Sequence, residues 1–131
     1  MQRITPLRAI PSKMIAIGLL SLASSMLSAN DSVELGGHAA SCSAYFFSAA
    51  NAKGVAAYEE LYGAGEYTFN LAVSAIGNEQ ALQHFSSASK QINLLMQKRW
   101  TDFYKVDEHY ESKCGALKEA HLKVQAEQAQ Q

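Results

Sequence analysis

A chain of 131 residues with eleven Lys and Arg and twelve Asp and Glu has room for one domain of nearly neutral charge. Three of the basic residues lie in the first 29 positions, so the rest of the chain has eight basic and twelve acidic residues, a net charge of −4. A mildly acidic domain has no electrostatic reason to bind nucleic acid or an anionic membrane surface. The composition therefore argues against both partners.

The first 29 residues have the order of a secretory signal peptide. Arg3, Arg8 and Lys13 precede an uncharged, strongly apolar run over residues 14–29, which ends on the small residue Ala29. We expect cleavage after Ala29, which leaves no stable membrane span and places the mature protein in the periplasm or outside the cell. The alternative is an uncleaved anchor, although sixteen helical residues cover only about 24 Å of a hydrocarbon core about 30 Å thick.

Two cysteines, Cys42 and Cys114, follow the predicted leader. An even number of cysteines in an exported chain predicts a disulfide, with two buried free thiols as the alternative. The bond would close a loop of 72 residues and add about 4 kcal/mol to the free energy of unfolding in the chain-entropy model. Because a domain of this size is only marginally stable without such links, the disulfide would be a large part of its stability.

The mature chain is rich in alanine, and no proline follows position 11, which predicts an all-α fold. The apolar spacing predicts a first helix over about residues 38–50 and a second over about residues 55–76. Residues 51–54 are the expected turn between them. Gly77 is the expected end of the second helix, because glycine readily adopts the backbone conformations that end helices.

The third helix is expected to be long. Asn78 is its predicted N-cap, and its apolar stripe continues to Tyr110, so we expect an end near Gly115. The alternative is that helical structure continues past Gly115, including as a short fourth C-terminal helix. The Gln-rich segment 125–131 has few apolar residues to bury and is predicted to fray, which assigns the helical domain to residues 30–124.

These lengths predict an up-down-up three-helix bundle after the cleaved signal peptide. With turns near residues 51–54 and 77–78, Cys42 is expected level with a residue near 111 to 114, close enough to Cys114 for a disulfide. The bond would then join the first helix to the end of the third.

No residue pattern indicates a catalytic, metal or cofactor site. The sequence lacks the Glu-x-x-His pairs of di-iron bundles, the Cys-x-x-Cys-His of covalent haem and the Gly-x-Ser-x-Gly of hydrolases. His84 and Ser87 share a helical face, but no third catalytic group accompanies them. His121 is the candidate for a non-covalent haem ligand and is more simply interpreted as a partly exposed neighbour of the core. We therefore expect no enzyme activity, no metal and no cofactor.

All twelve aromatic residues lie in the predicted helices, more than a three-helix core readily seats. Four of them fall outside the predicted apolar stripes and form the candidate partner surface: Phe47, Tyr67, Trp100 and Tyr104. The plainer alternative is that a fourth segment or a dimer covers them, or that the tyrosines lie half-exposed.

The leading hypothesis is a non-enzymatic exported protein that binds another protein. A small-ligand or haem-binding bundle and an acid-stress periplasmic chaperone that uses the histidines are the alternatives.

Overall fold

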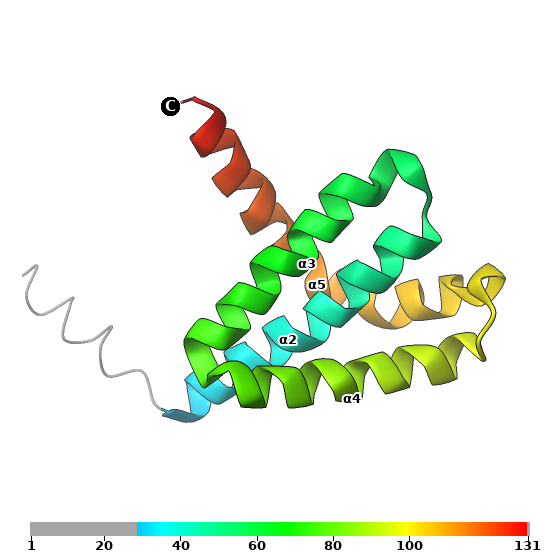
Figure 1. Ribbon diagram of the computed structural model, residues 1–131, viewed down its shortest axis with the longest axis horizontal. Helices are drawn as coiled ribbons and strands as arrows, with labels where there is room; N and C mark the ends of the chain where they lie inside the picture. Colours follow the sequence, from blue (N-terminus) through cyan, green and yellow to red (C-terminus); the bar gives the residue numbers. More distant parts are fainter. Residues whose placement is uncertain (1–28, 131) are drawn as a thin grey trace, which may run out of the picture. The chain divides into compact units, whose positions relative to one another are not determined.

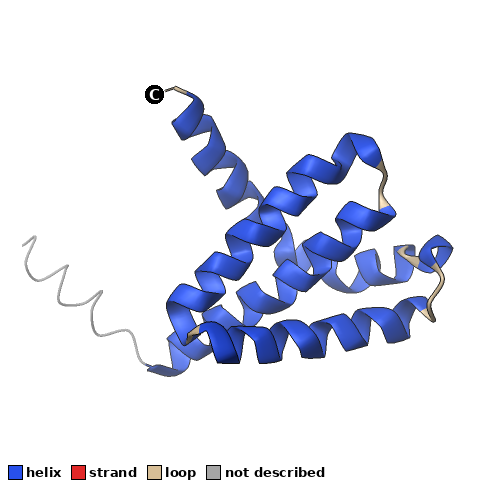
Figure 2. Cartoon of the chain, in the orientation of Figure 1, coloured by secondary structure: helices blue, strands red, loops and turns tan. Residues whose placement is uncertain are grey.

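The computed structural model describes residues 29–130, which form four α-helices and contain no strand (Figures 1 and 2). The helices are α2 (Ala29–Ala52), α3 (Val55–Ile76), α4 (Asn78–Met96) and α5 (Tyr104–Ala129), with one 3₁₀ turn, η1 (Trp100–Asp102). The helical bundle lies in the unit that begins at Ser32. The predicted all-α fold is confirmed for these residues, and the predicted number of three helices is wrong. The predicted signal peptide lies outside the described residues, apart from Ala29.

Helix α2 lies at the centre of the bundle. Its buried positions fall on several sides of the helix, and most carry small side chains: Ala39, Ala40, Cys42, Ser43, Ala44, Tyr45, Phe46, Ala49 and Ala50. The Ser43 hydroxyl donates a hydrogen bond to the Gly65 carbonyl of α3 (2.7 Å). The Phe47 ring packs against Phe85 of α4, with 6.0 Å between ring centroids, and Cys42 is bonded to α5. Short side chains let three helices approach α2 at the density of a protein interior.

Helix α2 begins well before the predicted start at residue 38, so the two glycines that were expected to precede the helix lie within it. Gly36 and Gly37 lie inside the helix and are points of close contact. A methyl group on Gly36 would lie 2.6 Å from Cγ2 of Ile76, and one on Gly37 would lie 3.1 Å from Cε1 of His84. The glycine pair therefore admits the junction of α3 and α4 rather than preceding the helix.

Helix α3 has the predicted bounds because a glycine with positive φ stands at each end. Gly54 has φ of 91° and Gly77 has φ of 84°, values that residues with a Cβ atom rarely adopt. Both predicted turns are confirmed. The prediction of Asn78 as the N-cap of the next helix is wrong by one position, because Gly77 occupies the capping position and Asn78 is already helical.

The predicted long third helix is wrong, because the chain reverses direction after Met96 (Figure 1). Gln97 (φ 52°) and Lys98 (φ 63°) adopt the left-handed conformation, which costs a residue with a side chain about 1–2 kcal/mol. The Arg99 N–H donates to the Met96 carbonyl (3.0 Å) and closes the turn. The apolar spacing continues through the reversal, since Phe103 follows Met96 by seven positions, so periodicity gives no sign of it.

This reversal brings the two cysteines together. Cys42 lies ten residues before the end of α2 at Ala52, and Cys114 lies ten residues after the start of α5 at Tyr104, about 15 Å along each helix. Their Cα atoms are 5.5 Å apart and their sulfurs are bonded. An unbroken third helix would have carried Cys114 eighteen residues, about 27 Å, beyond Met96. The predicted disulfide is therefore present, but the expectation that an unbroken third helix would bring Cys114 level with Cys42 is wrong, because only the reversal after Met96 brings Cys114 back to α2.

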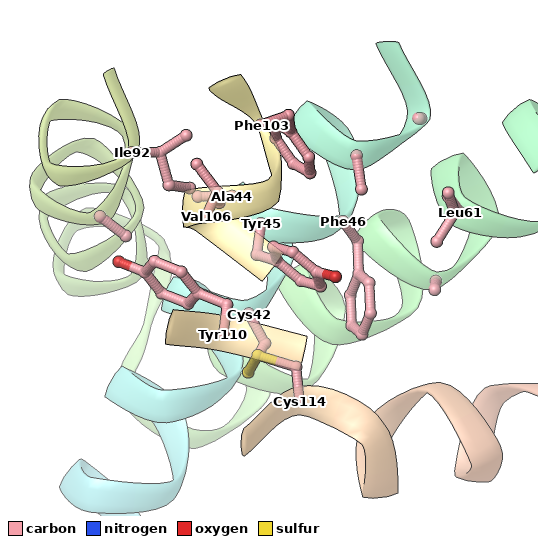
Figure 3. Packing of buried hydrophobic residues seen from close by; sticks show 14 of the residues in the cluster. Cys42, Ala44, Tyr45, Phe46, Leu61, Ile92, Phe103, Val106, Tyr110 and Cys114 are labelled. Atoms are coloured by element: carbon pink, nitrogen blue, oxygen red, sulfur yellow. A yellow bond between two sulfur atoms is a disulfide. The ribbon is translucent and has the colours of Figure 1, made fainter. Parts of the chain in front are cut away.

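Aromatic stacking organises the main core (Figure 3). The Tyr45 ring of α2 is nearly parallel to Phe103, at 6.2 Å between centroids, and to Tyr110 of α5, at 5.7 Å. Such aromatic pairs add about 0.5–1.5 kcal/mol beyond the apolar area that they bury. The largest fully buried apolar side chains come from α2, α4 and α5: Phe46, Ile92 and Val106.

Helix α5 extends through Gly115 and into the Gln-rich segment as far as Ala129. Gly115 therefore does not end a helix, and the fourth helix is long rather than short. The side chains of residues 125–130 are exposed, and fraying of this segment in solution stays a prediction. Among the helices of residues 29–130, none has both the length and the apolar character needed to cross a bilayer.

We expect the Cys42→Ala/Cys114→Ala double variant to lose about 4 kcal/mol of unfolding free energy, because the unfolded chain regains the freedom of a 72-residue loop. Urea denaturation at neutral pH measures the loss. Ser112→Ala, at an exposed position of α5, is the control and should leave stability unchanged. A double variant as stable as the control would contradict the prediction.

Gly115→Ala and Gly65→Ala should change stability in opposite directions. Gly115 lies inside α5 with open space around its Cα atom, so a methyl group there should add about 1 kcal/mol. A methyl group on Gly65 would lie 3.0 Å from the Phe47 ring, and overpacking of this kind costs about 1–3 kcal/mol. Thermal denaturation of the two variants tests the contrast, and equal shifts would show that the Phe47 ring moves aside freely.

Candidate functional site

Two of the four predicted partner-surface residues pack inside the bundle. Phe47 is half-buried and its ring meets the edges of Tyr62 (4.9 Å between centroids) and Phe85 (6.0 Å). Tyr67 is half-buried on α3 and its ring lies 5.3 Å from that of His121 on α5. The four candidates therefore do not form one surface, because these two rings fill contacts between helices.

The other two predicted residues lie together at the reversal between α4 and α5. Trp100 is 51% exposed and Tyr104 is 55% exposed, and Leu94 on the last turns of α4 is 77% exposed. The Trp100 ring stacks on Phe103, with 6.3 Å between centroids, and Phe103 is buried in the core. The exposed indole is therefore held by a fixed neighbour rather than carried on a free loop.

Basic residues surround these apolar side chains. Half of the eight basic residues after position 29 lie on this part of the chain: Lys90, Lys98, Arg99 and Lys105. Its one acidic residue is Asp102, whose carboxylate pairs with Arg99 (2.7 Å) and Lys105 (3.7 Å). We call the segment from residue 90 to residue 105 the basic tip. Its net charge is +3, whereas the chain after position 29 carries −4 in total.

A second feature is a hollow of about 620 Å³ beside the Cys42–Cys114 disulfide, between α2, α4 and α5. We call it the disulfide hollow. Eight side chains on its lining can donate hydrogen bonds: His38, Ser41, His84, Ser87, Gln91, His109, Tyr110 and Lys113. Nε2 of His38 lies 3.7 Å from Sγ of Cys42, and the His84 ring packs over Gly37. The His109 ring meets Tyr110 edge-on, 4.9 Å between centroids.

The sequence pattern gave no sign of this group of residues. His84 and Ser87 share one face of a helix, and both line the disulfide hollow, but most of the other donors come from two further helices. Residues that are 25 or more positions apart, as the three histidines are, share no spacing pattern. No signal in a single sequence could therefore have found the hollow without the packing of α2, α4 and α5.

The fourth histidine lies elsewhere. His121 is 8% exposed, its Nε2 has no hydrogen-bond partner in residues 29–130, and a methyl group on Gly63 would lie 3.0 Å from it. The prediction of a partly exposed position is therefore wrong, because Gly63 lets the imidazole enter the contact between α3 and α5. Within residues 29–130, no group of three or more His, Cys, Asp or Glu side chains is arranged to hold a metal ion.

The most perturbed titratable group is a core tyrosine. Burial, together with a hydrogen bond from its hydroxyl to Asp107 (2.7 Å), raises the pKa of Tyr45 well above the ordinary tyrosine value. Lys53 pairs with the other oxygen of the same carboxylate (3.0 Å). A phenol that keeps its proton cannot act as a base at neutral pH. The cluster therefore links α2 to α5.

No family model matches this chain, and no curated protein or solved structure matches it at a significant level.

The raised pKa of Tyr45 makes stability depend on alkaline pH. Above the ordinary tyrosine pKa of about 10, the unfolded chain releases the phenolic proton while the folded chain retains it, so the free energy of unfolding falls as pH rises. We expect Tyr45→Phe to reduce this fall in urea titrations between about pH 9 and about pH 11. The fall should not vanish, because burial also raises the pKa of Tyr110.

Tyr58→Phe is the control for this measurement, since Tyr58 is exposed on α3. This variant should keep the wild-type dependence on pH. If Tyr45→Phe also kept it, the Tyr45 hydroxyl would not differ between the folded and unfolded chains.

Proposed function

We propose that this chain is a non-enzymatic exported protein that binds an acidic surface of another protein through its basic tip. The observation that carries the proposal is the half-exposed Trp100, together with exposed Tyr104 and Leu94 in the same net positive segment of an acidic protein. Tryptophan, tyrosine and arginine are the residues that most often dominate binding energy at protein interfaces.

The structure around Trp100 supports a binding role because it limits the freedom of the side chains before a partner arrives. The indole stacks on buried Phe103, and Asp102 holds the Arg99 guanidinium through two hydrogen bonds of 2.7 and 3.1 Å. Ordering side chains at an interface usually costs binding energy, so residues that are already ordered favour affinity. Positive charge around them steers an acidic partner and disfavours a basic one.

The disulfide supports the proposed compartment. A disulfide-bonded pair fits an oxidising, exported location, and the predicted signal peptide in residues 1–29 would direct the chain there. We infer that the partner is met in the periplasm or outside the cell.

The proposal is tested by a photo-cross-linking residue in place of Tyr104 in the full chain, activated in cells that produce the protein. We expect one discrete protein adduct, which is lost in a second chain that also carries Trp100→Ala. The same cross-linker in place of Leu82 should give no such adduct. Leu82 is a matched control, because it is 48% exposed on the same helix that leads to the tip.

The partner identified from the adduct is then purified and its affinity measured. Trp100→Ala should weaken binding by about 30-fold or more, as expected for a hot-spot residue, and Leu82→Ala should have little effect. Higher salt should also weaken binding, because charges at the rim are screened. If no adduct forms and vesicles of anionic lipid shift the Trp100 emission to the blue, the tip binds membranes and the proposal is wrong.

A further inference from the structure

We propose that the disulfide hollow binds a small organic anion, a carboxylate or a phosphate ester with an apolar body. The hollow shares only Gln91 with the basic tip and none of the tip's basic or aromatic side chains, so this inference stands independently of the proposed protein partner.

The lining of the hollow offers more donors than the protein uses. Ser41, His84, Ser87 and Lys113 have neither a hydrogen bond nor an ion pair within residues 29–130, although they come from three packed helices. These four side chains line one space and have no hydrogen-bond partner among the described residues. A ligand bound in the hollow could therefore form hydrogen bonds with them. Hydroxyl, imidazolium and ammonium groups together suit the oxygens of an anion.

The remaining lining sets the size and character of the ligand. Val33, Ala88, the Tyr110 ring and the disulfide are apolar walls, and the volume of about 620 Å³ falls within the range of about 300–1,000 Å³ of small-molecule sites. A bare inorganic ion would leave most of this space and the apolar wall without contact. A small aromatic or aliphatic acid would use both the donors and the wall.

The charges that face the hollow are unequal. Helix α2 contributes Glu34 and His38, α4 contributes His84, and α5 contributes His109, Tyr110 and Lys113. The Tyr110 hydroxyl donates to Gln91 and its burial raises its pKa, so it stays neutral. Glu34 is then the single acid on the lining, beside Lys113 and the three histidines.

Two contacts hold the walls in place before a ligand binds. The disulfide joins the α2 wall to the α5 wall. The His84 ring of the α4 wall packs over Gly37 so closely that a methyl group there would lie 3.1 Å from Cε1. Because these walls are already ordered, little conformational entropy is lost when a ligand binds. This favours measurable affinity for a small ligand.

The test is a titration of the full chain with benzoate and with phenyl phosphate, followed through the imidazole Cε1–H NMR signals at fixed pH. We expect the signals of His38, His84 and His109 to move in a saturable way, while the signal of His121, buried between α3 and α5, stays in place. The anion that binds more tightly assigns the ligand to carboxylates or to phosphate esters. Benzamide, a neutral molecule of the same shape, should bind at least about tenfold more weakly.

Matched variants locate the site. Lys113→Gln and His84→Gln should each weaken benzoate binding about threefold to tenfold, whereas Lys123→Gln, on an exposed lysine outside the lining, should not. Glu34→Gln should strengthen binding, because it removes the single opposing charge. Glu34, Lys113 and Lys123 are exposed, so these three variants should keep the wild-type thermal denaturation midpoint.

Equal binding of benzamide and benzoate, shifts of His121 as large as those of the other histidines, or an affinity unaffected by Lys113→Gln would each overturn the proposal.

Discussion

The bundle depends on a central helix whose side chains are short enough for three neighbours to surround it. Alanine, serine and glycine along α2 let α3, α4 and α5 approach its backbone together, while Tyr45 and Phe46 supply the large apolar surfaces. A small domain buries only a limited fraction of its surface. Close packing of three helices around one central helix increases the apolar surface that a short chain can bury. The disulfide adds a covalent link between this central helix and the last one.

The reversal after Met96 decides what the rest of the surface offers. It requires two left-handed residues without glycine, Gln97 and Lys98, and such strain persists only where the surrounding contacts determine the conformation. Burial of Phe103 directly after the turn is one of those contacts. The same reversal returns α5 to α2, closes the disulfide hollow with residues of α5, and leaves Trp100 at an exposed corner.

Both candidate functional regions are locally unlike the chain as a whole. The protein after position 29 is acidic, yet the basic tip carries a net charge of +3, and the lining of the disulfide hollow has one acid beside a lysine and three histidines. The net charge of the whole chain therefore does not describe either region, because a partner responds to the field of the surface that it approaches. The two regions also suit different ligands: the tip has exposed aromatic side chains, which fits a macromolecular surface, and the hollow fits a small molecule.

The sequence by itself determined that the chain is helical, fixed the bounds of α3 between Gly54 and Gly77, and paired Cys42 with Cys114 by their number and setting. These properties depend on neighbours along the chain, which spacing and glycine positions report directly.

The position at which the third segment reverses is seen only in the tertiary structure, because the apolar period runs unbroken through Met96 and no glycine or proline marks the turn. Only the tertiary structure decided that Trp100 stays exposed while Phe47 is packed away, and that histidines from three helices share one hollow: His38, His84 and His109. Such placements depend on contacts between residues that are far apart in the sequence, and one-dimensional periodicity holds no information about them.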